Sequence, residues 1–326
     1  MIRSFVFSQG KLINQDWTLD LLRVVLYDAD VQIWVDMENS TPEENKAVLE
    51  GVFGFHPLAI EDCVGVSERP KIDDYENYVF AVIHAVDYVN SRHVFQTTEL
   101  NLFIGRNFLV TFHDQPLRSV GLVAERIQKK GHALPRSPDL LAYQVLDLLF
   151  DNYQPALVEL SSELAALEHR VLLGETKDVI AEVVNLQSEV QRLRQIMAPQ
   201  RDVVARMLHG EFPQVIRAHL TPYLRDLQDT LSRINDLADN FRDSLTATLQ
   251  VHLALQQMQV NRVIKVLTVL ATLALPVVAI TSFYGMNFAL PEFAYFHSHW
   301  GHLYVLGITV VVIGFLYWFM KRHNWL

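Results

Sequence analysis

The sequence predicts an α+β cytosolic domain followed by a long stalk helix that continues into a two-helix transmembrane hairpin. Three observations predict this fold class. Residues 1–135 mix alternating, β-rich segments with short helical ones. After Pro222 the next glycine is Gly285 and the one intervening proline is Pro276, so this stretch is compatible with one continuous helix. Two later runs, 266–283 and 303–320, contain no charged residue.

Residues 1–135 are expected to form the α/β domain. The alternating segment VQIWVD predicts a strand at 31–36, and Thr41 then supplies an N-cap with a proline and a capping-box glutamate, which predicts a helix to about Phe53. HPLAIEDC, from His56, predicts a second short helix. YVFAVIHAVDYV and TELNLFIGRNFLVTFH predict strands, with a turn at residues 105–107.

Residues 136–222 are expected to form a helical hairpin and a connector. Ser137 starts a helix that runs to roughly Leu173, and a second arm follows Thr176 and ends near Met197. The stalk helix then covers 223–262 and is amphipathic.

The two uncharged runs predict the transmembrane segments. The first span covers 263–284, a loop covers 285–302, the second span covers 303–320, and a basic tail covers 321–326. A helix of 18 residues is about 27 Å long, close to the thickness of a bilayer core. Basic residues flank both spans on the side away from the loop, and the loop contains neither Lys nor Arg, so both termini are expected in the cytoplasm.

Composition narrows the function classes. The formal net charge of -10 argues against nucleic acid and suits cations as partners, although excess acid also serves solubility. The single cysteine, Cys63, excludes an intrachain disulfide. We find no phosphate-binding glycine loop, nucleophile elbow or His-Glu-x-x-His segment, so we expect no enzyme activity and no cofactor.

Two spans per chain cannot enclose an aqueous path, so any conduction requires a homo-oligomer about an axis. The first span is the better candidate to line that axis, because Thr268, Thr272 and Ser282 interrupt its apolar residues. The second span is nearly featureless and suits contact with membrane lipid.

Several segments resemble one family. YGMNF at 284–288, the preceding NRVIKVLTVLATLALP, the terminal KRHNWL, and upstream HPLAIEDC and RPKIDDYENYVF are similar to the CorA family of divalent-cation transporters. The resemblance implies a funnel-like homopentamer in the inner (plasma) membrane. It also implies transport of Mg²⁺, often with Co²⁺ or Ni²⁺.

The resemblance further implies site residues. Gly285, Met286 and Asn287 would form the selectivity filter, with one Asn287 amide per subunit holding a hydrated ion by hydrogen bonds. Gly285 would permit the backbone turn. The implied pore lining is Asn261, Ile264, Leu267, Leu275 and Val278. Helix packing explains these apolar residues equally well, and the family often has a hydroxyl where this chain has Val278.

Two departures from the family pattern concern metal sites. The family pairs the aspartate of its HPL-ED motif with a stalk aspartate to hold an inhibitory magnesium ion. This chain has Asp62 but Gln250, so Asp62 is a weak regulatory candidate. A second group, which could collect a transition metal or simply be neutral interfacial residues, is His297, His299 and His302.

Two alternatives remain open at this stage. The zinc-transporting branch of the family is favoured by Gln250, the loop histidines and MAPQRDV from Met197, and opposed by Met286, where that branch usually has an aliphatic residue. The other alternative is a membrane-anchored scaffold without transport. Such a scaffold would need no asparagine at the outer mouth.

Overall fold

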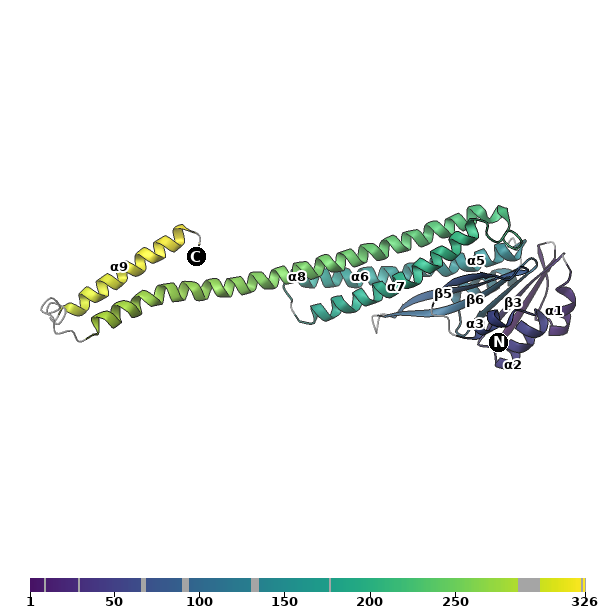
Figure 1. The fold of residues 1–326 in the computed structure, drawn as a ribbon, viewed down its shortest axis with the longest axis horizontal. Coiled ribbons are helices and arrows are strands. Elements are labelled where there is room, and N and C mark those ends of the chain that lie inside the picture. Colours follow the sequence, from purple (N-terminus) through teal and green to yellow (C-terminus); the bar gives the residue numbers. More distant parts are fainter. Residues whose placement is uncertain are drawn as a thin grey trace. The chain divides into compact units, whose positions relative to one another are not determined.

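The computed structural model describes residues 1–8, 10–28, 30–65, 69–89, 94–129, 135–175, 177–286, 300–323 and 325 (Figure 1). It contains two compact units, Met1–Leu249 and Gln250–Leu326. Each unit is described by itself.

The first unit is built on a seven-stranded sheet in the order β2-β1-β3-β7-β6-β5-β4. Its strands are β1 (Ile2–Ser8), β2 (Lys11–Gln15), β3 (Val31–Glu38), β4 (Lys71–Asp74), β5 (Tyr78–Val89), β6 (Val94–Gly105) and β7 (Phe108–His113). β3 and β7 pair in parallel, while the other neighbours pair antiparallel. The predicted strand at 31–36 and the predicted turn at 105–107 are confirmed.

Short helices cover one face of this sheet. They are α1 (Leu19–Val25), α2 (Pro42–Asn45), the π-helical η1 (Lys46–Val52) and α3 (Pro57–Val64). Leu22, Leu49 and Cys63 from these helices share a buried cluster with strand residues such as Phe80 and Phe103. The capping box at Thr41 is confirmed, but the helix after it is α for only one turn before it becomes π-helical.

Longer helices pack on the other face (Figure 1). They are α5 (Pro138–Asp151), α6 (Tyr153–Leu172) and α7 (Val179–Leu208), with α4 (Arg118–Gln128) against α5 and the short η2 (Ala218–Leu220) after α7. The buried Tyr153 hydroxyl donates to the His84 carbonyl oxygen at 2.5 Å and accepts from Gln200 Nε2 at 2.9 Å, which ties α6 and α7 to β5.

Two helix bounds in this region differ from the expected ones. The single arm predicted to run to Leu173 is divided at Asn152 into α5 and α6. The second arm continues through Pro199 to Leu208, instead of ending near Met197. A proline inside a helix removes one backbone donor, but the buried Val203, Val204 and Met207 beyond it hold the helix against the sheet domain.

Helix α8 (Thr221–Tyr284) is 64 residues long, and α9 (Gly301–Arg322) has 22 residues. Both are long and apolar enough to cross a membrane. The first part of α8 belongs to the first unit and buries a stripe at three- and four-residue spacing, namely Leu224, Leu227, Leu231, Ile234, Ala238, Phe241 and Leu245. The apolar window of α8 has no buried residue in this single chain.

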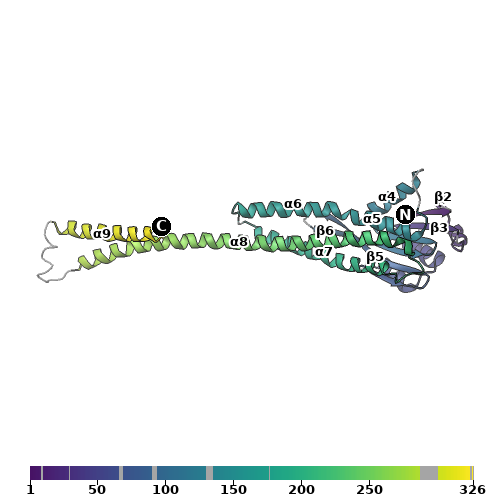
Figure 2. The same ribbon diagram turned by 90° about the horizontal axis from the view of Figure 1, so that it is seen from above.

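Within the second unit, α9 runs beside the C-terminal part of α8 (Figures 1 and 2). Each helix has one stripe of half-buried residues, as a two-helix contact produces. On α8 the stripe is Val269, Thr272, Leu273, Pro276, Val277, Ile280 and Tyr284. On α9 it is Val305, Thr309, Val312, Ile313 and Leu316, together with the buried Met320.

Candidate functional site

The residues expected to line a pore lie on the face of α8 that points away from α9. Leu267, Leu275 and Val278 each stand two residues before a half-buried stripe residue, and two residues turn an α-helix by about 200°. Their exposed fractions are 61%, 66% and 59%, and that of Ile264 is 54%. The hairpin therefore leaves an apolar face of α8 uncovered, which we call the open face: Ile264, Leu267, Leu275 and Val278.

Asn261 borders the open face rather than lying at its centre. Its side chain is exposed, and its Oδ1 accepts a hydrogen bond from Gln257 Nε2 at 3.1 Å. The hydroxyls of Thr268 and Thr272 donate to backbone carbonyls one turn earlier, each at 2.8 Å. Because these hydroxyl protons are used inside the helix, they are not available to a ligand, whereas the amides of Gln257 and Asn261 are exposed.

The end of α8 explains the glycine at the start of Gly-Met-Asn. The Gly285 N–H donates to the Thr281 carbonyl at 2.9 Å, and the Met286 N–H donates to the Phe283 carbonyl at 3.3 Å. A Cβ at Gly285 would lie 2.9 Å from the Thr281 carbonyl oxygen, which is backbone and cannot move aside. Close approach, rather than a left-handed φ, is therefore the reason for glycine here.

Three of the predicted site residues, Asn287, His297 and His299, lie outside the described residues. His302 is described, and it is exposed in the first turn of α9. Met286 is 54% exposed just beyond the end of α8.

The regulatory candidate Asp62 already has a cationic partner. Its Oδ2 lies 2.5 Å from Lys71 Nζ, and Asp73 Oδ2 lies 3.3 Å from the same nitrogen. Burial alone would lower the pKa of Lys71, but the hydrogen bonds to Asp62 and Asp73 outweigh it and raise that pKa. A lysine ammonium is thus paired with one oxygen of Asp62, while Gln250 is exposed on α8.

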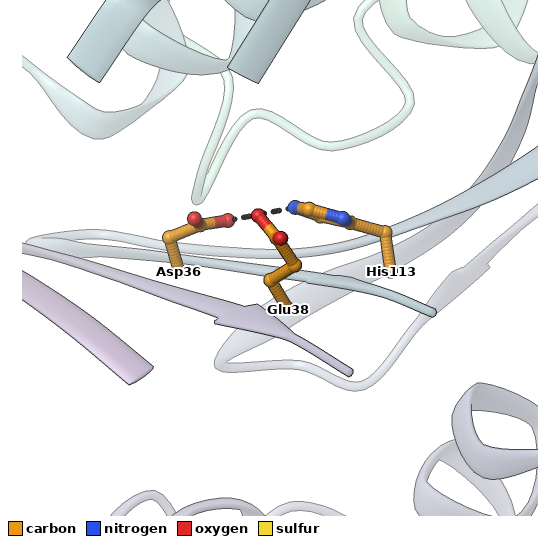
Figure 3. A group of neighbouring side chains, drawn as sticks. All are labelled: Asp36, Glu38 and His113. Carbon is orange, nitrogen blue, oxygen red and sulfur yellow. Dashed lines mark hydrogen bonds and ion pairs between the residues drawn. The ribbon is translucent and has the colours of Figure 1, made fainter. Parts of the chain in front are cut away.

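A buried polar cluster that the sequence did not reveal joins Asp36, Glu38 and His113 (Figure 3). Asp36 and His113 stand on the parallel strands β3 and β7, where Asp36 pairs with Thr111 and Glu38 with His113. One ligand atom from each of the three side chains lies within 4.8 Å of the others. The spacing of 77 residues between Asp36 and His113 gives no local signal, so only the strand pairing reveals the group.

Hydrogen bonds inside this cluster argue against a metal ion. Asp36 Oδ1 accepts from Thr111 at 2.6 Å and contacts His113 Nε2 at 3.1 Å, while Oδ2 accepts from Arg3 at 2.6 Å. His113 Nδ1 lies 2.7 Å from the Gln115 carbonyl oxygen, so both ring nitrogens of His113 face protein oxygens and neither is open to a metal ion. A bound metal would have to displace these donors, so the cluster is a structural ion network.

Electrostatics agree with that assignment. Burial opposes ionisation of Asp36, but the hydrogen bonds and charge of His113, together with Thr111 and Arg3, lower the pKa of the carboxyl below its ordinary value. The carboxylate therefore stays ionised in the fold because three side chains, Arg3, Thr111 and His113, contact it.

Comparisons with known proteins agree with the arrangement of a sheet domain, a long helix and two apolar helices. Residues 29–322 match the family described as CorA-like Mg²⁺ transporter protein. The chain is 30% identical over 301 residues to the cobalt/magnesium transport protein CorA of Thermotoga maritima, covering 92% of this chain and 85% of that protein. It is 22% identical over 309 residues to the zinc transport protein ZntB of Yersinia enterocolitica, covering 91% and 89%.

A solved structure has the same fold. The complete structure of the CorA magnesium transporter from Methanocaldococcus jannaschii superimposes with a TM-score of 0.81 at 21% identity, covering 99% of this chain and 98% of that chain. The family match, the relative aligned along most of both chains and the two apolar helices together show that this chain is a membrane-spanning member of the CorA-like Mg²⁺ transporter family.

Proposed function

We propose that this protein conducts divalent cations, chiefly Mg²⁺ and also Co²⁺ or Ni²⁺, across the inner (plasma) membrane through a pore built from several copies of the chain. The family resemblance suggests five copies, with both termini in the cytoplasm. The observation that carries the proposal is the open face of α8, which the chain's own α9 does not cover.

Symmetry gives this face its role. When copies assemble about an axis, each presents the same surface, and a helix that is covered on one side by α9 can turn its other side inward. The open face would then form stacked apolar rings at Ile264, Leu267, Leu275 and Val278. Such rings stop ion flow when they lose water, so they act as a hydrophobic gate.

Polar groups are placed at the two ends of the proposed pore. Asn261 stands at the cytoplasmic end, where its amide is exposed. At the outer end the filter would be Gly285, Met286 and Asn287, with the Asn287 amides accepting hydrogen bonds from the water shell of the ion. Since Mg²⁺ gives up water reluctantly, neutral amides can select a hydrated ion without holding it too tightly to leave.

The proposal includes only weak inhibition of transport by internal magnesium, because Asp62 is paired with Lys71. An inhibitory ion must bind the closed state much better than the open one, and that requires several carboxylate contacts. Here Gln250 supplies an amide instead of a carboxylate, and Asp62 Oδ2 forms an ion pair with Lys71 Nζ at 2.5 Å. We therefore expect conduction to stay largely open at high internal magnesium.

The test is uptake into liposomes that contain only this protein, with Mg²⁺, Co²⁺, Ni²⁺ and Zn²⁺ compared under an imposed potential. Uptake of Mg²⁺ with Co²⁺ or Ni²⁺ supports the proposal. If the assembled protein takes up none of these four ions, the membrane-anchored scaffold becomes the better assignment.

Zinc transport is the second candidate, supported by the sequence features Gln250, the histidines His297, His299 and His302, and MAPQRDV from Met197. Replacement of His297, His299 and His302 together by Ala should leave Mg²⁺ uptake nearly unchanged, because imidazole offers little to a hard hydrated ion. Selective loss of Zn²⁺ uptake in the triple variant would make zinc the better assignment.

A further inference from the structure

The end of the transmembrane hairpin that lies away from the Gly-Met-Asn segment carries four exposed cationic side chains. We call this group the basic end: Arg262, Lys265, Lys321 and Arg322. The first two stand on α8 just before its uncharged run, and the last two close α9 directly after its uncharged run. None of the four belongs to the open face of α8 or to the proposed filter.

The two helices bring these cations to nearly the same level. The half-buried stripes of α8 and α9 have the same length and end at Val269 and Met320, which therefore lie side by side in the antiparallel pair. Lys265 lies one turn beyond Val269, and Lys321 and Arg322 directly follow Met320. At 1.5 Å per residue, these three cations fall within about 5 Å of one another along the helix axes, and the fourth lies about one turn further.

The basic end has no acidic partner in the part of the chain that the structure describes. None of the ion pairs among the described residues involves these four cations. After Asp243 the one acidic residue of the sequence is Glu292, which belongs to the segment between α8 and α9. Asp243 precedes Arg262 on α8 by about 28 Å of helix. The positive charge is therefore available to an external anion.

The helix dipole accounts for only a part of this charge. Cations in the last turn stabilise a helix because its carbonyl end carries about half a negative charge. The last turn of α9 holds two full charges, Lys321 and Arg322. Helix α8 continues through Arg262 and Lys265, so those two cations have no helix end to compensate.

Aromatic side chains mark the basic end as a membrane border. The Arg322 guanidinium lies over the ring of Trp318, 5.5 Å from its centroid, and this ring is 54% exposed. The Trp325 N–H donates to the Met320 carbonyl oxygen at 2.9 Å, which holds a second exposed indole at the end of α9. Indole rings prefer the headgroup region of a bilayer, so Arg322 is placed among lipid headgroups.

We propose that the basic end binds the headgroups of anionic phospholipids, with Lys265, Lys321 and Arg322 donating hydrogen bonds to phosphate oxygens. The Arg322 guanidinium can donate two parallel hydrogen bonds to one phosphate, and Trp318 positions it for this contact. Each basic side chain next to a transmembrane helix strengthens the attraction to anionic lipid by about fivefold. The inference requires that α8 and α9 cross the membrane, but it does not require ion conduction.

The test measures which lipids contact the assembled full chain. The protein is placed in phosphatidylcholine bilayers with a trace of phosphatidylglycerol or phosphatidylcholine that carries a nitroxide on an acyl chain. Electron paramagnetic resonance then separates immobilised lipid beside the protein from free lipid. We expect phosphatidylglycerol to be preferred about fivefold at low salt. The preference should nearly vanish at 1 M NaCl, because the Debye length shortens from about 30 Å at 0.01 M to about 3 Å.

Charge variants locate the contact. Lys321→Gln combined with Arg322→Gln should reduce the preference to about half, and the further changes Arg262→Gln and Lys265→Gln should abolish it. The charge-conserving pair Lys321→Arg and Arg322→Lys should keep it. Assembly of each variant is checked by size-exclusion chromatography.

Two matched controls separate this contact from general effects of charge and aromatic content. Lys177→Gln with Arg201→Gln removes two exposed cations of the first unit and should leave the preference unchanged. Trp318→Leu should weaken the preference because Arg322 loses the ring beneath it, whereas Tyr317→Leu on the same turn should not.

Three results would overturn the proposal, whatever the transport assay shows. The first is equal immobilisation of the two labelled lipids by the wild type at low salt. The second is the same preference in the wild type and in the variant that lacks all four cations. The third is displacement of phosphatidylglycerol by inorganic phosphate beyond the effect of sodium chloride at equal ionic strength, which would assign the site to free phosphate.

Discussion

At the scale of single residues, ion pairs decide which acidic side chains remain available to a metal. Asp36 is buried and ionised, yet Arg3, Thr111 and His113 use its oxygens. Asp62 is 40% exposed, yet Lys71 contacts it at 2.5 Å. A cation that binds Asp62 would therefore compete with the Lys71 ammonium for its carboxylate.

The Asp36 network predicts a large loss of stability on Asp36→Asn. Removal of the ionised carboxyl leaves the Arg3 guanidinium, the Thr111 hydroxyl and the His113 ring without their shared partner, which costs roughly 3–5 kcal/mol. The control is Glu38→Gln on the same strand, whose carboxylate lies 3.9 Å from Arg3 and is partly exposed, so its loss should cost less than about 1 kcal/mol. Melting of the full chain in detergent checks both; equal melting temperatures for the two variants would contradict the assignment.

The same network predicts a direction for acid sensitivity. The pKa of Asp36 is lower in the folded chain than in the unfolded one, so ionised Asp36 stabilises the fold above the unfolded value of about 4. That contribution is lost as the pH falls through the lowered, folded pKa. Asp36→Asn should therefore show a flatter dependence of melting temperature on pH below about 4 than the wild type does.

Gln250 and Lys71 together predict weak control by internal magnesium. Flux in vesicles preloaded with graded magnesium should change little in the wild type, whereas Gln250→Asp should restore inhibition because it returns one carboxylate per site. The driving force must be matched between samples. Strong inhibition of the wild type that Asp62→Ala removes would show that Asp62 acts without a second carboxylate.

At the scale of elements, α8 combines two environments in one helix. Its first part buries Leu231, Ala238 and Leu245 in the sheet-bearing unit. Its later part packs one stripe of residues against α9 and leaves the open face uncovered. Both faces of the later part are apolar, and they differ in whether they point toward α9 or away from it.

This separation predicts opposite effects for two nearby substitutions. Leu275→Asn places an amide on the open face, which should ease wetting of the proposed gate and raise basal flux. Val277→Asn places the same amide against α9, where it should lower the yield of assembled protein without raising flux per assembly. Flux normalised to assembled protein distinguishes them, and equal effects at both positions would remove the basis for assigning the open face to the pore.

Several elements could be predicted from the sequence because their signals are local. The capping box at Thr41, the turn at 105–107 and the uncharged runs each depend on neighbouring residues. The break at Asn152 and the extension of α7 past Pro199 could not be predicted, because packing on the sheet decides them. The Asp36 cluster depends on strand pairing between distant segments, which no local pattern encodes.

At the scale of the whole molecule, the described part of the chain has two helices that are long and apolar enough to cross a membrane, and the proposed pore requires several copies of the chain. The family fixes the architecture of a sheet domain, a long helix and an apolar hairpin. The proposal adds a pore on the symmetry axis, which is lined by the open face and has the Asn287 amides as its filter at the outer end.

The most direct test of this account is the flux of Mg²⁺ into liposomes that contain only this protein or only Asn287→Ala, with assembly of both checked by size-exclusion chromatography. Asn287→Ala removes every proposed filter amide while leaving α8 intact. The account predicts Mg²⁺ uptake by the wild type and its loss in an Asn287→Ala variant that still assembles. Near-normal Mg²⁺ flux in the correctly assembled variant would contradict it.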